Sequence, residues 1–102
     1  MSRGPDAGTL LERAIVAHAA RHGVAVAIVE AGWERWASAT FTGARHALTL
    51  EATSGDAFDR WLAVLPEAEL SLRRMLVADL TIVAVQRGEP VRLALEALTV
   101  DE

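Results

Sequence analysis

The chain of 102 residues contains no cysteine, lysine, asparagine or tyrosine. Without cysteine there is no disulfide framework, thiolate nucleophile or cysteine-ligated metal centre, and without lysine there is no Schiff base or P-loop lysine. The aromatic residues are few: Trp33, Trp36, Phe41, Phe58 and Trp61. The remaining groups for chemistry are histidine, serine, threonine, arginine and carboxylates.

Basic charge is also scarce, since 14 acidic residues exceed 10 basic ones and give a net charge of −4. A negative chain disfavours sequence-independent binding to nucleic acid. Weak nucleic-acid binding through Arg73 and Arg74, with Arg87 and Arg92 nearby, is therefore an alternative to the main interpretation. No apolar run approaches the roughly 20 residues that span a bilayer, and the first eight residues lack the pattern of a secretion signal. We expect a cytoplasmic protein without membrane contact.

Hydrophobic residues make up 52% of the chain, which is enough for a core without disulfides. No polar or Gly/Ser-rich run divides the sequence into two parts. We expect residues 1–8 to form a flexible tail and residues 9–102 to form one domain.

Two helices are predicted from three-and-four spacing of apolar residues. Thr9 and Glu12 match a capping box, which predicts a first helix from Leu10 to His22. The polar group before Asp56 and the ring of Pro66 predict a second helix from Asp56 to Leu65.

Five strands are predicted from two-residue alternation. Three precede the second helix, over Val24–Ala31, Trp33–Thr42 and Arg45–Thr53, with a turn at Ala31 and Gly32. The last two form a long hairpin from Leu70 to Val100, with its turn near Gly88. The order αβββαββ predicts an α+β fold, in which both helices pack on one face of a mainly antiparallel five-stranded sheet.

A weak internal repeat accompanies this order. Arg45-His46-Ala47-Leu48 recurs as Arg92-Leu93-Ala94-Leu95, at an offset of 47 residues. Identity at this offset is only slightly above chance, so the sequence indicates a duplication without establishing it.

The three histidines suggest an enzyme as an alternative. His18 and His22 lie one helical turn apart, a spacing compatible with a shared metal ion, and His46 could add a third ligand. A metal-dependent or acid/base enzyme would combine them with a carboxylate such as Asp79. The H-E-x-x-H pattern is absent, so two helix-edge histidines are the simpler interpretation, and we assign no metal, cofactor or catalytic residue.

Known catalytic and nucleotide-binding signatures are missing, because no G-x-S-x-G, G-x-G-x-x-G or P-loop motif occurs. The leading prediction is therefore a small non-enzymatic binding or assembly module. No family is identified from motif residues.

The partner surface is predicted from the sheet. Its strands are apolar at both parities, but two short helices cover one face only. A homodimer through the uncovered face is the preferred arrangement; a different subunit or a small apolar ligand are the other ways to cover it. The expected contact residues are Trp33, Trp36, Met75, Val77, Asp79 and Val83.

Overall fold

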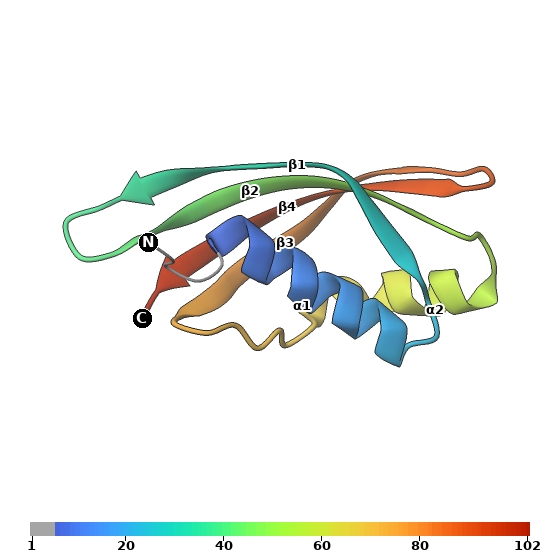
Figure 1. Cartoon of the computed structure of the whole chain (residues 1–102), viewed down its shortest axis with the longest axis horizontal. Coiled ribbons are helices and arrows are strands. Elements are labelled where there is room, and N and C mark those ends of the chain that lie inside the picture. Colours follow the sequence, from blue (N-terminus) through green and yellow to red (C-terminus); the bar gives the residue numbers. More distant parts are fainter. Residues whose placement is uncertain (1–5) are drawn as a thin grey trace.

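The structure, a computed structural model, describes residues 6–102 and shows a single α+β domain. Two helices accompany a four-stranded antiparallel sheet with the strand order β1-β2-β4-β3 (Figure 1). The elements in chain order are α1 (Ala7–Arg21), β1 (Val26–Ala37), β2 (Thr42–Ala52), α2 (Asp56–Val64), a short 3₁₀ turn (Leu65–Glu67), β3 (Met75–Gln86) and β4 (Val91–Asp101).

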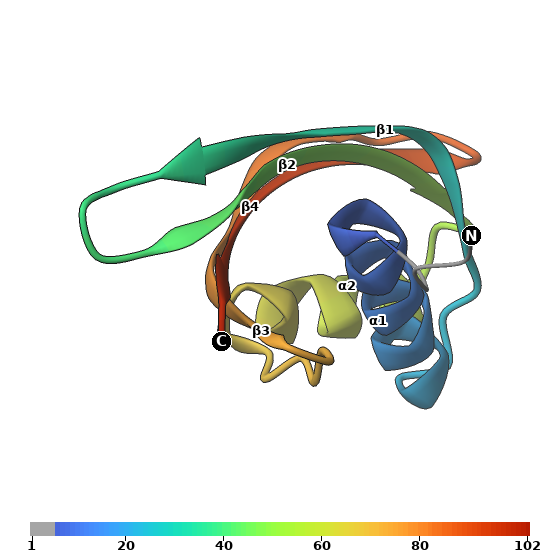
Figure 2. The same cartoon turned by 60° about the vertical axis from the view of Figure 1, so that its left-hand side comes forward.

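Both helices lie inside the curve of the sheet, on the same face, as the sequence predicts (Figure 2). Leu11 and Ile15 of α1 and Phe58 and Trp61 of α2 are almost completely buried against the sheet. The sheet side of this core includes Leu48, Leu50, Val91, Leu93 and Leu95. Each large apolar side chain buried in this way stabilises the fold by about 1.5–3 kcal/mol.

The prediction of five strands is wrong, and the order is αββαββ. The residues expected to form two strands with a turn at Gly32 form one continuous strand, in which Gly32 pairs with Ala47. A β-bulge between Ile28 and Glu30 shifts the side-chain alternation by one residue. In the sequence, such a shift has the same hydrophobic pattern as a break between two strands. The turn lies further along, where the Ser38 hydroxyl accepts a 3.0 Å hydrogen bond from the N–H of Phe41.

The first helix begins earlier than predicted, at Ala7. Asp6 is the N-cap, and its carboxylate accepts a 2.8 Å hydrogen bond from the N–H of Thr9. The predicted capping box at Thr9 is therefore wrong, because an aspartate three residues upstream provides the same kind of cap. Of the predicted tail, Asp6 caps this helix and Ala7 and Gly8 lie within it, whereas residues 1–5 lie outside the described residues.

The second helix agrees closely with prediction, and the final hairpin is present but begins at Met75 instead of the predicted Leu70. The α-helix ends at Val64, one residue before the predicted end, and the chain continues as a 3₁₀ turn that contains Pro66. The hairpin strands β3 and β4 pair along their whole length, with bulges between Val77 and Asp79 and between Ile82 and Ala84.

The two halves of the chain repeat the same αββ unit. The second helix and both strands of the second unit begin 49 residues after their counterparts, and the bulge after Ile28 recurs after Val77 at this offset. Ala47 pairs with Glu96, which is also 49 residues away, so a pseudo-two-fold axis passes through this pair at the centre of the sheet. The structural offset is 49, not the 47 that the sequence indicates.

No helix within residues 6–102 is long and apolar enough to cross a membrane.

Candidate docking surface

The face of the sheet that points away from the helices is covered by no other described element (Figure 2). We call it the outer face. Its side chains come from all four strands in matched rows, because neighbouring strands pair in register. One row contains Glu34, Arg45, Leu98 and Asp79, and the next contains Gly32, Ala47, Glu96 and Thr81.

Three adjoining hollows lie on the outer face. The largest, of about 650 Å³, is lined by the two rows above and by Trp33, His46 and Ala97, which lie between those rows along the strands. Hollows of about 330 and 310 Å³ follow it along the strands. The first and second share Gly32, Ala47 and Glu96, and the second and third share Glu30, Thr49 and Ala94. Together they form one continuous depression, which we call the outer groove.

The outer groove has a floor of small side chains on the central strands, including Ala47, Thr49 and Ala94. Two exposed valines line it: Val29 is the unpaired residue of the β1 bulge, and Val83 is the unpaired residue of the second β3 bulge. From Leu98 to Arg92 the groove follows β4 for about 20 Å, at the usual rise of an antiparallel strand. The edge strands β1 and β3 are separated by three strand spacings, or about 14 Å.

The outer face is negatively charged. Five carboxylates accompany two guanidinium groups, Arg45 and Arg92, which leaves a net charge of −3; the carboxylates belong to Glu30, Glu34, Glu51, Asp79 and Glu96. Arg92 forms a 2.6 Å ion pair with Glu51. Within the described part of the chain, the other four carboxylates and Arg45 form no ion pair. An unneutralised negative field therefore extends along the groove.

The first bulge in β3, between Val77 and Asp79, distributes the predicted contact residues of this strand between both faces. Met75 is buried and Val77 is half-buried toward the helices, whereas Asp79 and Val83 are exposed on the outer face. Regular alternation would place all four on one face, but each bulge inserts one residue and reverses the parity. Asp79 accepts a 3.1 Å hydrogen bond from the Thr81 hydroxyl and remains exposed.

The two tryptophans of β1 point to opposite faces. Trp33 lies on the inner side, against the first turn of α1, where a Cβ added to Gly8 would be 2.6 Å from the Trp33 ring. Trp36 points to the outer side beside Gly43, and its buried indole Nε1 has no hydrogen-bond partner within the described part of the chain. Trp33 is 39% exposed and Trp36 is half-buried, so both combine packing with solvent contact.

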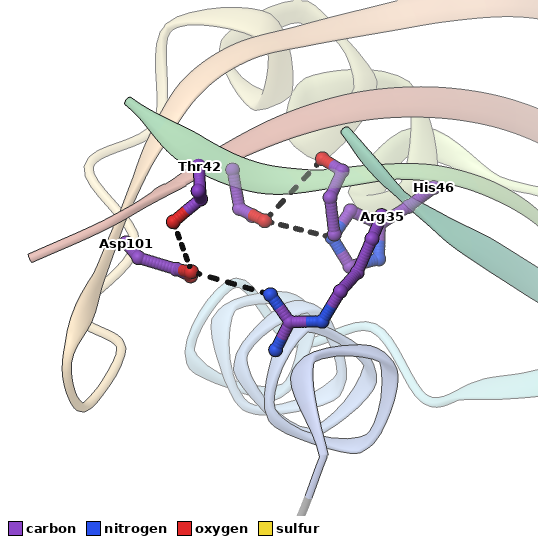
Figure 3. Close-up of polar contacts among 6 residues, drawn as sticks. Arg35, Thr42, His46 and Asp101 are labelled. Carbon is purple, nitrogen blue, oxygen red and sulfur yellow. Dashed lines mark hydrogen bonds and ion pairs between the residues drawn. The ribbon is translucent and has the colours of Figure 1, made fainter. Parts of the chain in front are cut away.

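His46 is buried on the inner face, next to Trp33. Its Nε2 lies 3.0 Å from the hydroxyl oxygen of Thr99 (Figure 3), and its Nδ1 has no hydrogen-bond partner among residues 6–102. Burial lowers the pKa of His46, and the nearby carboxylate of Asp6 partly opposes that shift. The counterparts of Trp33 and His46 in the second αββ unit are Ile82 and Leu95, so this polar and aromatic pair is specific to the first unit.

A surface ion pair lies beyond His46 on the same inner side. Arg35 and Thr42 converge on the carboxylate of Asp101, at 3.5 Å and 2.9 Å respectively (Figure 3). These contacts connect β1 and β2 to the end of β4, and no sequence pattern indicates them because Asp101 is 59 residues from Thr42 in the chain. The exposed arginine limits the strength of this pair to about 1 kcal/mol or less.

The histidines of α1 have structural contacts. Nδ1 of His18 accepts a 3.0 Å hydrogen bond from the indole N–H of Trp61, and the His22 ring lies 4.7 Å from the His18 ring. Burial lowers the pKa of His18, and the charges of His22 and Arg21 lower it further. Among residues 6–102, no three histidine or acidic side chains are grouped to hold a metal ion, so the alternative site with His46 lacks a ligand set.

The arginines considered for nucleic-acid binding do not form an unpaired stripe. Arg73 and Arg74 are exposed in the segment before β3, but Arg87 forms a 2.6 Å ion pair with Asp59, and Arg92 is paired as described above. Two of the four guanidinium groups are therefore neutralised by neighbouring carboxylates.

Compared with protein families, characterised proteins and solved structures, the chain shows no significant match.

Proposed function

We propose that the protein is a small non-enzymatic binding module and that the outer face of its sheet is the docking surface. The observation that supports this function is the continuity of the outer groove, whose three hollows are lined by all four strands and share lining residues on β1, β2 and β4. Binding surfaces are concave and combine small or apolar side chains with a few polar groups. The groove has this composition.

The chemistry of the groove supports binding rather than catalysis. Its polar side chains are carboxylates, threonines, arginines and the amide of Gln86, while the side chains of the two buried histidines form their hydrogen bonds on the helix side of the sheet. A hydrolytic or acid/base site requires a nucleophile or proton acceptor within reach of a positioned partner group. The groove provides docking contacts without such an arrangement.

Self-association through the same face is the second candidate. Val29, Leu76 and Val83 are each about half exposed, at 47%, 56% and 54%, and all three belong to the outer side of the sheet. Burying them against a second copy would contribute favourable apolar contact. This arrangement is the homodimer that the sequence predicts.

Binding of the neutral dye Nile red, combined with size exclusion and light scattering, tests the docking function. Val29→Asp/Val83→Asp places charge in the groove, and Val64→Asp is the matched control, because Val64 is an exposed valine on α2. We expect the double variant to lose dye emission by about threefold or more, with the control unchanged. Equal loss in both proteins, or no loss in the double variant, would overturn the proposed function. A wild-type dimer that the double variant dissociates would support self-association.

A further inference from the structure

We infer that the outer groove binds an amphipathic helix of a partner protein that presents arginine or lysine side chains along its flanks. This inference depends on the proposed docking function of the outer face and adds the chemistry of the partner. Three properties of the groove lead to it: its dimensions, its floor and its charge.

The dimensions fit one helix lying along the strands. A length of about 20 Å corresponds to nearly four helical turns, and a helix with its side chains is about 10 Å wide, against about 14 Å between the edge strands. The floor contains Gly32, Ala47 and Ala94. Larger side chains at these positions would prevent a helix from packing closely on the sheet. A partner with small or apolar residues on one stripe can therefore approach the sheet closely.

The carboxylates lie where the flanks of such a helix would be. Glu30 and Glu34 project from β1 on one side, and Asp79 projects from β3 on the other. An arginine or lysine on each flank would reach them, while its aliphatic stem covers Val29 or Val83. Complementary charge of this kind increases the association rate and selects the partner.

The negative charge of the outer face disfavours three other occupants: a second copy of the chain, a nucleic acid and an anionic lipid surface. Two copies docked through this face would bring together two surfaces of net charge −3, and like charges in contact cost several kcal/mol. Phosphate backbones and anionic lipid surfaces are repelled for the same reason. A cationic protein segment is the occupant that the electrostatics favour.

Isothermal titration calorimetry with a pair of synthetic peptides tests the inference. Both are alanine- and leucine-rich helices of about four turns; one has an arginine in each turn and the other has glutamate in its place. Glu30→Gln/Glu34→Gln/Glu96→Gln removes charge from the groove, and Glu67→Gln/Glu69→Gln/Glu102→Gln removes the same charge from exposed positions elsewhere.

We expect the arginine peptide to bind and the glutamate peptide not to bind. The groove variant should weaken binding about tenfold, with the control variant changed by less than about twofold. If both peptides bind equally well and neither binds to Val29→Asp/Val83→Asp, the inference of a cationic partner is wrong. The proposed docking function of the outer face is retained in that case. A wild-type dimer that occupies the face would have the same consequence. Arginine-peptide binding unaffected by every groove variant, or absent altogether, would overturn the inference.

Discussion

The indole Nε1 of Trp61 donates a 3.0 Å hydrogen bond to Nδ1 of His18, which joins α2 to α1 inside the core. The bond requires an unprotonated Nδ1, because only the neutral ring has a lone pair at that atom. The two helices are thus connected by a contact whose stability depends on pH.

Acidification should destabilise the protein through His18. Its pKa in the folded protein lies below the ordinary value of 6.5, chiefly because the ring is buried. Below about pH 6.5 the unfolded chain therefore binds more protons than the folded protein, and the free energy of unfolding falls as the pH approaches about 5. In urea unfolding at several pH values, His18→Asn should reduce this decline, because its amide oxygen replaces Nδ1 as an acceptor that does not titrate. An unchanged decline in the variant would contradict this role.

His46 should contribute to the same decline in the free energy of unfolding at low pH, and leucine should be able to replace it. Burial lowers its pKa as well, so it too resists protonation in the folded protein below about pH 6.5. His46→Leu introduces the residue found at the equivalent position of the second unit, Leu95, and removes Nδ1, a buried nitrogen that has no hydrogen-bond partner among the described residues. At pH 7.5 we expect the free energy of unfolding to change by about 1 kcal/mol or less, because Thr99 keeps its contact with the Ala44 carbonyl. A loss much larger than this would show that the imidazole is needed for stability.

The close approach of β2 to β4 should make Gly43 sensitive to substitution. An added Cβ would lie 1.9 Å from the Thr99 carbonyl oxygen, whereas at Gly32 nothing lies within 4 Å of the same atom. Gly43→Ala should destabilise the protein by about 2 kcal/mol or more, because the backbone must move. Gly32→Ala is the matched control and should change stability by about 1 kcal/mol or less. Similar melting temperatures for the two variants would be inconsistent with the observed strand spacing.

The sequence predicts the elements whose signals are local. The second helix follows from its polar start and from Pro66, and its predicted end differs from the observed one by a single residue. The final hairpin follows from its long apolar run and the turn near Gly88. The helices also share one face of the sheet, as expected from the order of the elements (Figure 2).

The features that depend on strand pairing could not be predicted in this way. Gly32 has the composition of a turn but continues a strand because Ala47 pairs with it. The bulges after Ile28, Val77 and Ile82 change which side chains face outward, and no residue type marks them. The bulges after Ile28 and Val77 bring Glu30, Glu34 and Asp79 to the outer face, so uniform alternation predicts a less charged face. The pairing of Ala47 with Glu96, which reveals the repeat, is likewise a tertiary property.

Paramagnetic relaxation enhancement with a nitroxide-labelled arginine peptide tests the docking surface most directly. The label broadens amide signals near the bound peptide, so it locates the peptide on one side of the domain. We predict strong broadening at Ala47 and Ala94 in the centre of the outer face, with the amides of Val16 on α1 and Val64 on α2 unaffected. Broadening of the helix amides, with Ala47 and Ala94 unchanged, would contradict the account.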